Sequence, residues 1–498
     1  MKNKFYLGKV SFGLTLFAAL FLVACTNEDN PVIDPDSPYG EVQWTDVSGT
    51  TITNTKNIVI GDMVNDITYV RESIILSASG RTVEVMLECP AMAAIPLKDG
   101  YEDTLRTVEN VTLINKGTIT IHTKQIVEHF KNQIRTTDHP DRPYYYLRLL
   151  GLFGGKNSTL INDGLIDVYF DHDKNAPFTI YCFAMIGGDG STIINNGTIR
   201  FHGNGSSRTR LRCVGTFGDY VMATNKGRMQ AEVEMVEDSR MMTQGGNYSS
   251  FINDGEMIIR QPGRLMGITR YGDNQVVNNN LIDITGIDEP SWATSVVEPE
   301  DQCVCALFEP LNPTHQEMPE LVNNGTINIK IESSEKTNPK KQGYGMFFDV
   351  MGPSHKVVDV INKGKITLSQ TGPQHLNMAE LGIVTRESMK SIASGSIRIK
   401  SWNTTLRDFS QTRDLFLGKG AKIDFTDGKL LLERADGYVD GTTYSVDPNA
   451  LFYNADSNQS GFVYSYDGYE DLTIEAAAPD KQTLNWDKTN KVVSLTNK

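Results

Sequence analysis

The chain has 498 residues, of which 39% are hydrophobic and 22% are charged, with 43 glycines and 19 prolines. This composition excludes a disordered chain, and the length fits either two or three compact domains or one elongated body of repeats. The formal net charge of −14 argues against a nucleic-acid partner, because phosphate binding requires clustered positive charge.

Residues 1–24 are predicted to be a lipoprotein signal peptide. Three lysines within the first nine residues precede an apolar stretch over 12–24, which is too short to span a bilayer but suits a signal-peptide core. The stretch ends in Leu-Val-Ala-Cys, which resembles the lipobox of bacterial lipoproteins. The resemblance implies that Cys25 carries the lipid and is the first mature residue. An ordinary secretory signal with a chance cysteine is the alternative.

Residues 25–40 are predicted to be the lipidated cysteine and a flexible tether, because they are polar, acidic and rich in proline. Glu28 and Asp29 resemble the surface-export signal of Bacteroidota lipoproteins. The resemblance implies a lipid anchor in the outer membrane, with display at the cell surface.

One short pattern then recurs along the chain: an apolar pair, Asn-x-Gly, and an alternating apolar strand. The first copy runs over 113–121, and successive asparagines are 25 to 47 residues apart. In the copy at Asn278, Asn280 replaces the glycine, and divergent copies are expected at Gly395 and Gly420. The corner asparagines are Asn115, Asn162, Asn195, Asn225, Asn253, Asn278, Asn323 and Asn362.

The repeat predicts a stack of coils. After each asparagine, apolar residues alternate with polar ones, as in Ile119 and Ile121, which is typical of a half-buried strand. Asn and Gly enter the left-handed backbone region at low cost, so we expect a left-handed corner at every copy. The fold predicted is all-β: a single-stranded parallel β-helix, right-handed, over 111–425. Residues 41–110 would form an N-terminal cap and first coils, and 426–498 a C-terminal β cap.

The strings Ile-Asn-Asn-Gly-Thr-Ile at 194–199 and Val-Asn-Asn-Gly-Thr-Ile at 322–327 resemble repeats of β-helical passenger domains in bacterial adhesins and autotransporters. The resemblance covers about 110–425 and implies architecture more than activity, because the matching residues are corner and core positions. The chain has no evident translocator barrel, and the lipid on Cys25 would replace that anchor.

Two cysteines offer a check on the register of neighbouring coils. Cys182 and Cys213 each lie five residues before a glycine, at Gly187 and Gly218. We expect the two cysteines at the same point of adjacent coils, within disulfide range. Two stacked buried thiols are the equal alternative. A short helix is expected over 125–134, within the insertion 124–142.

The sequence contains few candidates for catalytic or ligand-binding residues. The weak catalytic candidates are Asp167, Asp171 and Asp173, since a glycosidase needs two carboxylates across a groove. Acidic strings at strand ends are more often solvated loops, and tyrosines in an alternating strand are more often half core. No cofactor and no metal site are expected. The weak carbohydrate-binding candidates are Tyr144, Tyr145, Tyr146 and Arg148.

Three functional hypotheses follow. The first is a non-catalytic cell-surface lipoprotein, adhesin-like or glycan-binding, that displays its faces and loops to a glycan or to a host or cell-surface ligand. The second is a β-helical carbohydrate-active enzyme, either a polysaccharide lyase or a glycoside hydrolase. The third is a structural spacer. Carboxylates converging in a cleft would favour the enzyme.

Overall fold

The computed structural model describes most of the chain between residues 39 and 497. The described residues are 39–40, 42–61, 71–76, 83–94, 108–136, 144–176, 178–216, 218–243, 246, 248–269, 275–287, 303–311, 320–335, 337, 341–350, 357–373, 377–385, 396–406, 412–417, 430–434, 444–446, 474–476, 480, 482–487 and 492–497. Cys25 and the whole of 1–24 lie outside them.

The described strands form three parallel sheets, and the chain steps through each sheet in turn. The first sheet contains β3 (Thr51–Asn54), β7 (Thr112–Asn115), β10 (Thr159–Asn162), β13 (Thr192–Asn195), β16 (Met222–Asn225), β19 (Ser250–Asn253), β22 (Gln275–Asn278), β25 (Glu320–Asn323), β32 (Leu430–Arg434) and β34 (Ile474–Ala476). The second contains β1 (Tyr39–Gly40), β4 (Asn57–Ile60), β8 (Thr118–His122), β11 (Leu165–Phe170), β14 (Thr198–Gly205), β17 (Arg228–Met235), β20 (Glu256–Gln261), β23 (Leu281–Gly286) and β26 (Thr326–Glu332).

The third sheet contains β2 (Gln43–Thr45), β6 (Val83–Ala94), β9 (Tyr144–Phe153), β12 (Thr179–Gly187), β15 (Thr209–Thr216), β18 (Asp238–Thr243), β21 (Arg264–Thr269), β24 (Cys303–Leu311), β27 (Gln342–Val350), β29 (Asn377–Thr385) and β31 (Thr412–Leu417). Two longer strands, β28 (Val357–Thr371) and β30 (Ser396–Leu406), run through the bend and belong to both the first and the second sheet.

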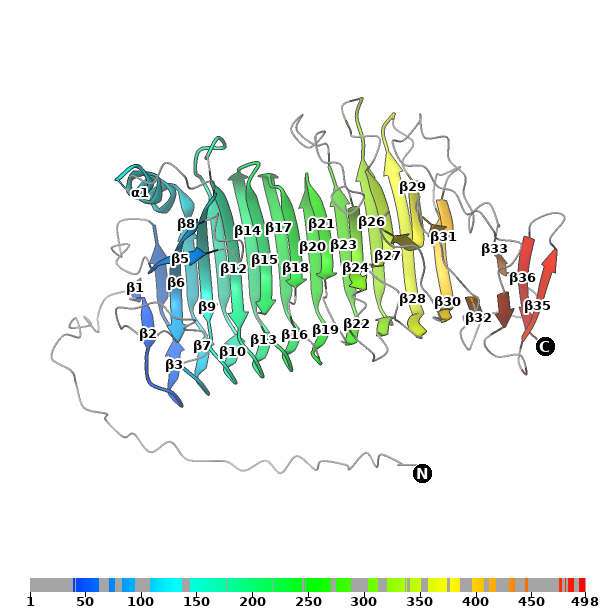
Figure 1. Ribbon diagram of the computed structural model, residues 1–498, viewed down its shortest axis with the longest axis horizontal. Helices are drawn as coiled ribbons and strands as arrows, with labels where there is room; N and C mark the ends of the chain where they lie inside the picture. The colour runs from blue at the N-terminus through cyan, green and yellow to red at the C-terminus, as the bar shows by residue number, and fades with distance from the viewer. Residues whose placement is uncertain are drawn as a thin grey trace. The chain divides into compact units, whose positions relative to one another are not determined.

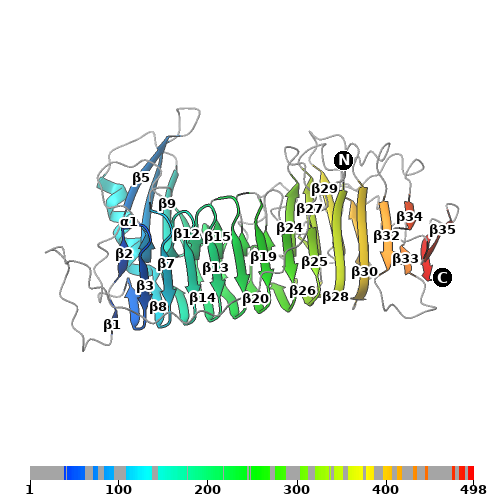
Figure 2. The same cartoon turned by 90° about the horizontal axis from the view of Figure 1, so that it is seen from below.

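Successive coils lie side by side in chain order, so that each strand pairs with its equivalents one coil before and one coil after (Figure 1). Figure 2 shows the same order from below, with β7, β13, β19 and β25 following one another along the first sheet. The predicted fold is confirmed: this body is a parallel β-helix. Each coil hydrogen-bonds to its neighbours, so the stack leaves unpaired strand edges only at its ends.

The predicted inward pairs fill a shared interior. In coil after coil the two alternating apolar residues after the asparagine are fully buried, as with Ile119 and Ile121, or Ile327 and Ile329. They belong to one hydrophobic core cluster that runs from Ile58 to Leu368. The period of two therefore reports burial on one face of each strand.

The asparagines of the repeat are buried inside the bend between the first and second sheets. Each amide nitrogen donates to the amide oxygen of the asparagine one coil later, with N–O distances of 2.8 Å at every step from Asn54 to Asn323. Several of these nitrogens also donate to backbone carbonyls, so the amides are held in a continuous ladder. Buried polar groups stabilise a fold only when they are paired, and here each amide pairs with the next.

The expectation of a left-handed backbone at this bend is wrong. None of the described asparagines or glycines of the motif has a positive φ. Glycine is needed for a different reason: a Cβ at Gly227 would lie 1.9 Å from the carbonyl oxygen of Gly197 in the preceding coil, and Gly164 and Gly197 show the same conflict at 2.0 Å. The glycines allow close contact between backbones of adjacent coils.

Left-handed residues occur instead at the bend between the third and first sheets, which we call the outer corner. Each lies three residues before the first inward side chain of a first-sheet strand. Their φ angles range from 53° to 80°. The outer-corner residues are Gly49, Asn110, Asn157, Gly190, Tyr220 and Tyr248.

The structure corrects the ends of the predicted repeat. A copy that the pattern missed bends at Asn54, where Lys56 takes the place of the glycine. The copy expected at Gly395 is misplaced, because Ile397 pairs with Val358, before the bend. It is Ser401 that stands opposite Asn362. The copy expected at Gly420 lies outside the described residues.

Other elements attach to the coils. The expected short helix is present as α1 (Thr123–Thr136), directly after β8, and β5 (Arg71–Leu76) pairs antiparallel with β6. Near the C-terminus β33 (Tyr444–Val446), β36 (Val492–Asn497) and β35 (Gln482–Asp487) form an antiparallel sheet. Parallel pairing continues past residue 425 through β32 and β34. Within the described ranges, no helix has the length and apolar character needed to cross a membrane.

Candidate functional site

Asp167 projects from the outer face of β11 and is held by the next coil. Arg200 donates two hydrogen bonds to it, Nε to Oδ1 at 2.8 Å and Nη2 to Oδ2 at 2.6 Å. His202 Nε2 lies 2.9 Å from Oδ1, within ion-pair distance. Burial raises the pKa of Asp167, but the hydrogen bond from Arg200 and the charge interactions with His202 and Arg200 outweigh it and lower the pKa. The carboxylate is therefore ionised at neutral pH and unsuited to general acid catalysis.

Asp171 caps the helix that follows β8. Its Oδ1 accepts a hydrogen bond from the backbone nitrogen of Lys124 at 2.7 Å, and its own backbone nitrogen donates to Thr123 Oγ1 at 3.0 Å. A carboxylate at a helix N-terminus pairs with free backbone N–H groups and with the helix dipole. These hydrogen bonds of Asp171 join α1 to the second sheet.

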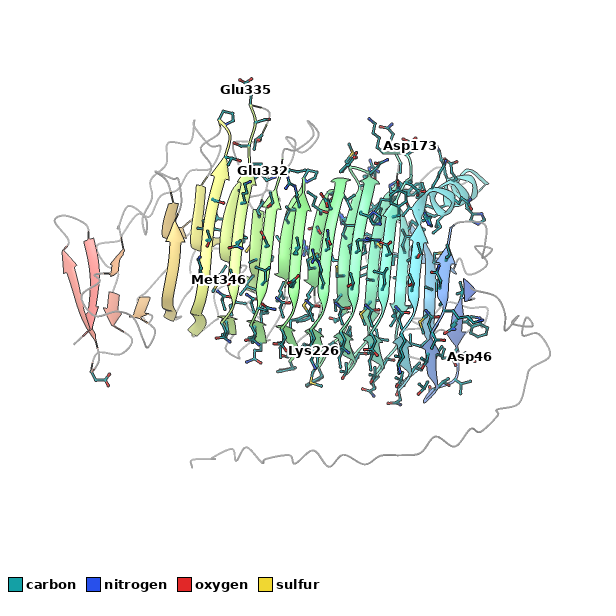
Figure 3. All side chains as sticks on the ribbon, turned by 180° about the vertical axis from the view of Figure 1, so that it is seen from behind. Asp46, Asp173, Lys226, Glu332, Glu335 and Met346 are labelled. Atoms are coloured by element: carbon teal, nitrogen blue, oxygen red, sulfur yellow. The ribbon has the colours of Figure 1, made fainter. Side chains whose placement is uncertain are left out.

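Asp173 closes a turn. Its Oδ1 accepts from the backbone nitrogen of Asn175 at 3.0 Å and from the Asn175 side chain at 3.2 Å. Figure 3 shows Asp173 at the same end of the strands as α1. Lys226, which is labelled at the asparagine bend, lies at the opposite end. Each of the three candidate aspartates is thus held by a different partner: Arg200, the first turn of α1, and Asn175.

His172, between these aspartates, is buried with only 3% of its surface exposed. Its Nδ1 lies 2.8 Å from Thr123 Oγ1, and its buried Nε2 has no hydrogen-bond partner among the described residues. Burial lowers the pKa of His172 to about 4, although the charges of Asp171 and Asp173 act to raise it. The ring is therefore neutral at physiological pH.

Three ring side chains lie side by side on the outer face of the second sheet, and we call them the ring column: His122, Tyr169 and His202. The strand register places both histidines opposite Tyr169, one coil before and one coil after it. The ring centroid of Tyr169 is 5.8 Å from that of His122 and 5.1 Å from that of His202. Tyr169 is 37% exposed. The ring column thus offers an accessible aromatic face flanked by the Asp167–Arg200 pair.

The structure does not bring the tyrosine candidates to Asp167. Tyr144, Tyr145 and Tyr146 begin β9, which belongs to the third sheet, whereas Asp167 lies in the second. The side chains of these tyrosines lie outside the described residues, and Arg148 is half-buried. The β9 strand of the third sheet and Asp167 of the second sheet therefore belong to different faces of the coil.

The cysteines are not in the register that the glycine spacing predicted. Cys182 stands opposite Leu211, and Met185 opposite Val214, so Cys213 lies two residues further along its strand than expected. Both thiols are buried and free. Burial raises the pKa of Cys182 beyond its usual range and does the same to Cys213, where Cys182 adds to the effect.

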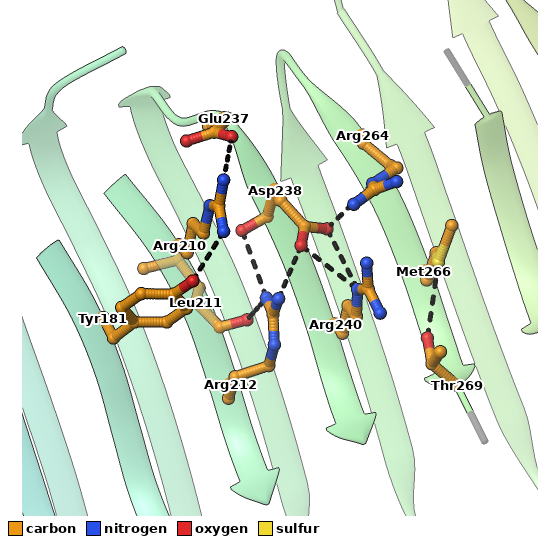
Figure 4. Close-up of polar contacts among 10 residues, drawn as sticks. All are labelled: Tyr181, Arg210, Leu211, Arg212, Glu237, Asp238, Arg240, Arg264, Met266 and Thr269. Carbon is orange, nitrogen blue, oxygen red and sulfur yellow. Dashed lines mark hydrogen bonds and ion pairs between the residues drawn. The ribbon is translucent and has the colours of Figure 1, made fainter. Parts of the chain in front are cut away.

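Sequence reasoning missed a cluster of charges on the third sheet, which Figure 4 shows in close-up. Asp238 is 2% exposed and accepts hydrogen bonds from Arg212 Nη2 at 2.5 Å and Arg240 Nε at 3.1 Å, with Arg264 Nε 3.4 Å away. Beside it, Arg210 donates to Tyr181 Oη and Glu237 Oε1, both at 2.5 Å. Arg210, Asp238 and Arg264 stand at one point of successive strands, a register that no sequence motif indicated.

Burial decides what this charge cluster can do. It raises the pKa of Asp238, but the surrounding arginines outweigh it and hold the pKa well below its usual value. Burial also lowers the pKa of Arg212 to about 10, against the attraction of Asp238. Because Arg212, Asp238 and Arg240 are all less than 10% exposed, the cluster joins β15, β18 and β21 and offers little surface to a ligand.

The described residues contain no group of three His, Cys, Asp or Glu side chains placed to hold a metal ion. In the comparison with protein families, residues 92–227 are similar to the model of the BigA third pectate lyase-like domain. The matched segment covers the coils from β6 to β16, which contain Asp167, Arg200 and the ring column. No curated protein matches the chain, and no solved structure matches it.

Proposed function

We propose that this protein is a lipid-anchored surface protein whose β-helix binds glycans without cleaving them. The proposal rests on two observations taken together. The aspartates that could act on a sugar are committed to Arg200, to α1 and to a turn, while Tyr169 remains exposed between two imidazoles. An aromatic face with charged and hydrogen-bonding neighbours suits binding, because it supplies contact area and orientation at little entropic cost.

Anchoring follows from the N-terminal sequence. Lipid on Cys25 would hold the mature chain at the outer membrane, and Glu28-Asp29 would direct it to the cell surface. The long outer faces of the β-helix would then be presented to extracellular polymers. The cellular test is Cys25→Ser, which should move the protein from the membrane fraction to the soluble fraction and remove its exposure to protease on intact cells.

Binding is tested with the purified full-length protein and a panel of soluble polysaccharides, neutral and acidic. Affinity gel electrophoresis measures retention, and assays for reducing ends and unsaturated products measure cleavage. We expect retention of at least one polymer with no product. Tyr169→Ala should weaken retention of at least one bound polymer by about fivefold, whereas Tyr169→Phe should retain that polymer as the parent does. Gln230→Ala, at a half-buried outward position two coils away from Asp167, is the matched control.

Two results would overturn the proposal. Retention of no polymer would remove glycan binding. Release of unsaturated or reducing ends that depends on Asp167 would establish an enzyme instead.

A further inference from the structure

The outer corner carries a feature that the fold does not require. Four of its six left-handed positions hold glycine or asparagine, at Gly49, Asn110, Asn157 and Gly190. The two positions that follow in the next coils hold Tyr220, with φ of 59°, and Tyr248, with φ of 55°. Glycine and asparagine enter this region readily, whereas a bulky side chain does so only against a steric penalty. Such outliers persist mainly where they serve a function.

The two tyrosines are exposed and stacked. Tyr220 is 63% exposed and Tyr248 is 48% exposed. Their ring centroids are 5.1 Å apart and their planes differ by 16°. Met222, two residues after Tyr220, is 57% exposed. These three account for most of the large hydrophobic side chains that are exposed within the described ranges, the others being Val47 and Tyr169. Apolar surface gathered in one place marks an interaction site more often than scattered residues do.

The coil before Tyr220 places no ring beside it. Its outer-corner residue is Gly190, which places no side chain beside Tyr220. One coil further back is Asn157, whose Oδ1 lies 2.2 Å from where a Cβ on Gly190 would stand. Coils repeat at about 4.8 Å, the separation of one strand from the next. The Asn157 amide oxygen therefore already fills the Cβ position of Gly190, and a flat ring that continues the stack from Tyr220 would lie farther from the backbone, against that amide.

The polar groups around this space indicate the ligand. Asp189 is exposed, and its Oδ1 accepts a hydrogen bond from the backbone nitrogen of Asp219 at 3.0 Å, next to Tyr220. Asn157 is exposed on the other side. Carboxylate and amide groups bind hydroxyls well, and two aspartates at one corner repel an anionic ligand. A pyranose ring has an apolar face for the tyrosine and a rim of hydroxyls for the polar groups.

We infer that the outer corner at Tyr220 and Tyr248 is a binding site for a neutral hexose unit of a glycan. The sugar face stacks on Tyr220, above Gly190, with Asn157 and Asp189 hydrogen-bonding its hydroxyls. Tyr248 supports Tyr220 from the next coil. This inference rests on the proposed glycan binding and names a second, separate surface for it.

The test uses the full-length protein and affinity gel electrophoresis with a soluble β-glucan, a mannan and a galactan, with polygalacturonate as the acidic comparator. Tyr220→Asn and Tyr248→Asn remove the rings but keep a residue that the corner accepts at positions 110 and 157. Gly190→Asn adds a side chain beside Tyr220 and displaces the Asn157 amide, without changing either tyrosine. Thermal unfolding of each variant confirms that the coils remain folded, and both tyrosine variants should unfold at or above the temperature of the parent.

We expect a retained neutral polymer to bind at least tenfold more weakly to the double tyrosine variant, and about fivefold more weakly to Gly190→Asn. Tyr220→Phe should bind within about twofold of the parent because the stacking face remains. Retention of polygalacturonate alone would overturn this inference and leave the proposed function standing. The same holds if neutral retention depends on Tyr169 and is unchanged by the corner variants. Retention of no polymer would overturn both.

Discussion

Two bends of the described coils, the asparagine bend and the outer corner, differ in almost every respect. The asparagine bend, between the first and second sheets, is buried and nearly identical from coil to coil, with amides 2.8 Å apart. The outer corner, between the third and first sheets, is left-handed and changes its residue from glycine to asparagine to tyrosine. A neighbouring coil presses against the first bend, whereas the second faces solvent at Asn157, Tyr220 and Tyr248.

Residues that repeat from coil to coil in this chain therefore serve the structure, and positions where the repeat is broken are the candidates for function. The asparagine and glycine of the first bend are fixed by contact with the same residues one coil away, so they cannot vary freely. Solvent places no such demand on the outer corner, and its side chains can serve a ligand. Substitutions at the two bends should therefore have very different effects on stability.

The largest effect is expected for Gly227→Ala. Its Cβ would lie 1.9 Å from the carbonyl oxygen of Gly197, so the backbones of two stacked coils would have to shift apart locally. We expect the free energy of unfolding to fall by about 4 kcal/mol, or the protein not to fold. Thermal and urea unfolding, with circular dichroism, measure it.

Gly49→Ala is the matched control at the outer corner. A Cβ there meets nothing within 4 Å, and only the φ of 80° opposes it. We expect a loss of about 1 kcal/mol. Equal losses in the two variants would show that coil contact is not what requires glycine at the asparagine bend.

A smaller effect is expected for Asn195→Ala, which interrupts the ladder. Asn195 accepts from Asn162 and donates to Asn225, both at 2.8 Å, so its removal leaves unpaired amide groups in the interior. We expect a loss of about 3 kcal/mol, measured by urea unfolding. Asn196→Ala is the control, because that exposed side chain only donates to Asp163 at the surface and should contribute less than about 0.5 kcal/mol. A loss below 1 kcal/mol for Asn195→Ala would contradict the role of the ladder.

The contrast between buried and exposed polar groups extends to His172. Its pKa is about 4 in the folded protein, against an ordinary value of 6.5. Between these values the unfolded chain binds a proton that the folded protein does not, so the free energy of unfolding falls as the pH falls from about 6.5 to 4. The total loss from this group is about 3 kcal/mol or less.

Urea unfolding of the parent and of His172→Asn at several pH values measures this loss. Asparagine stays neutral throughout, so the variant should lose stability less steeply between pH 6.5 and 4. Gln230→Asn, which replaces no titratable group at a half-buried position, is the control and should keep the slope of the parent. Parallel curves for the parent and His172→Asn would show that His172 does not control the acid sensitivity.

Much of the fold could be predicted from the pattern of residues. Asn115 and its successors, with the aliphatic pairs after them, identified the bends and the inward faces, because stacked coils place the same demand on every copy. The copies at Asn54 and Ser401 escaped, since Lys56 replaces one glycine and serine replaces one asparagine. The glycines of the third sheet misled the register of Cys182 and Cys213, because the strands there are offset by two residues.

The candidate site was less accessible to such reasoning. Asp171 and Asp173 stood out as an acidic string, but their roles depend on different contacts. Asp171 binds the start of α1, 47 residues earlier in the chain, whereas Asp173 binds Asn175 in a local turn. Asp238 carried no motif at all. Its three arginines come from different coils, and only the lateral pairing of β15, β18 and β21 brings them together.

The stack of parallel β-coils could be predicted from the amino-acid sequence, because a period of two and a recurring Asn-x-Gly leave few other ways to bury the apolar residues. Only the folded structure shows which side chains meet across coils: the amide ladder, the Asp238 cluster, the ring column and the stacked Tyr220 and Tyr248. The physical reason is that lateral neighbours in a β-helix are separated by 25 or more residues of chain, and variable loops between them hide the register until the strands are paired.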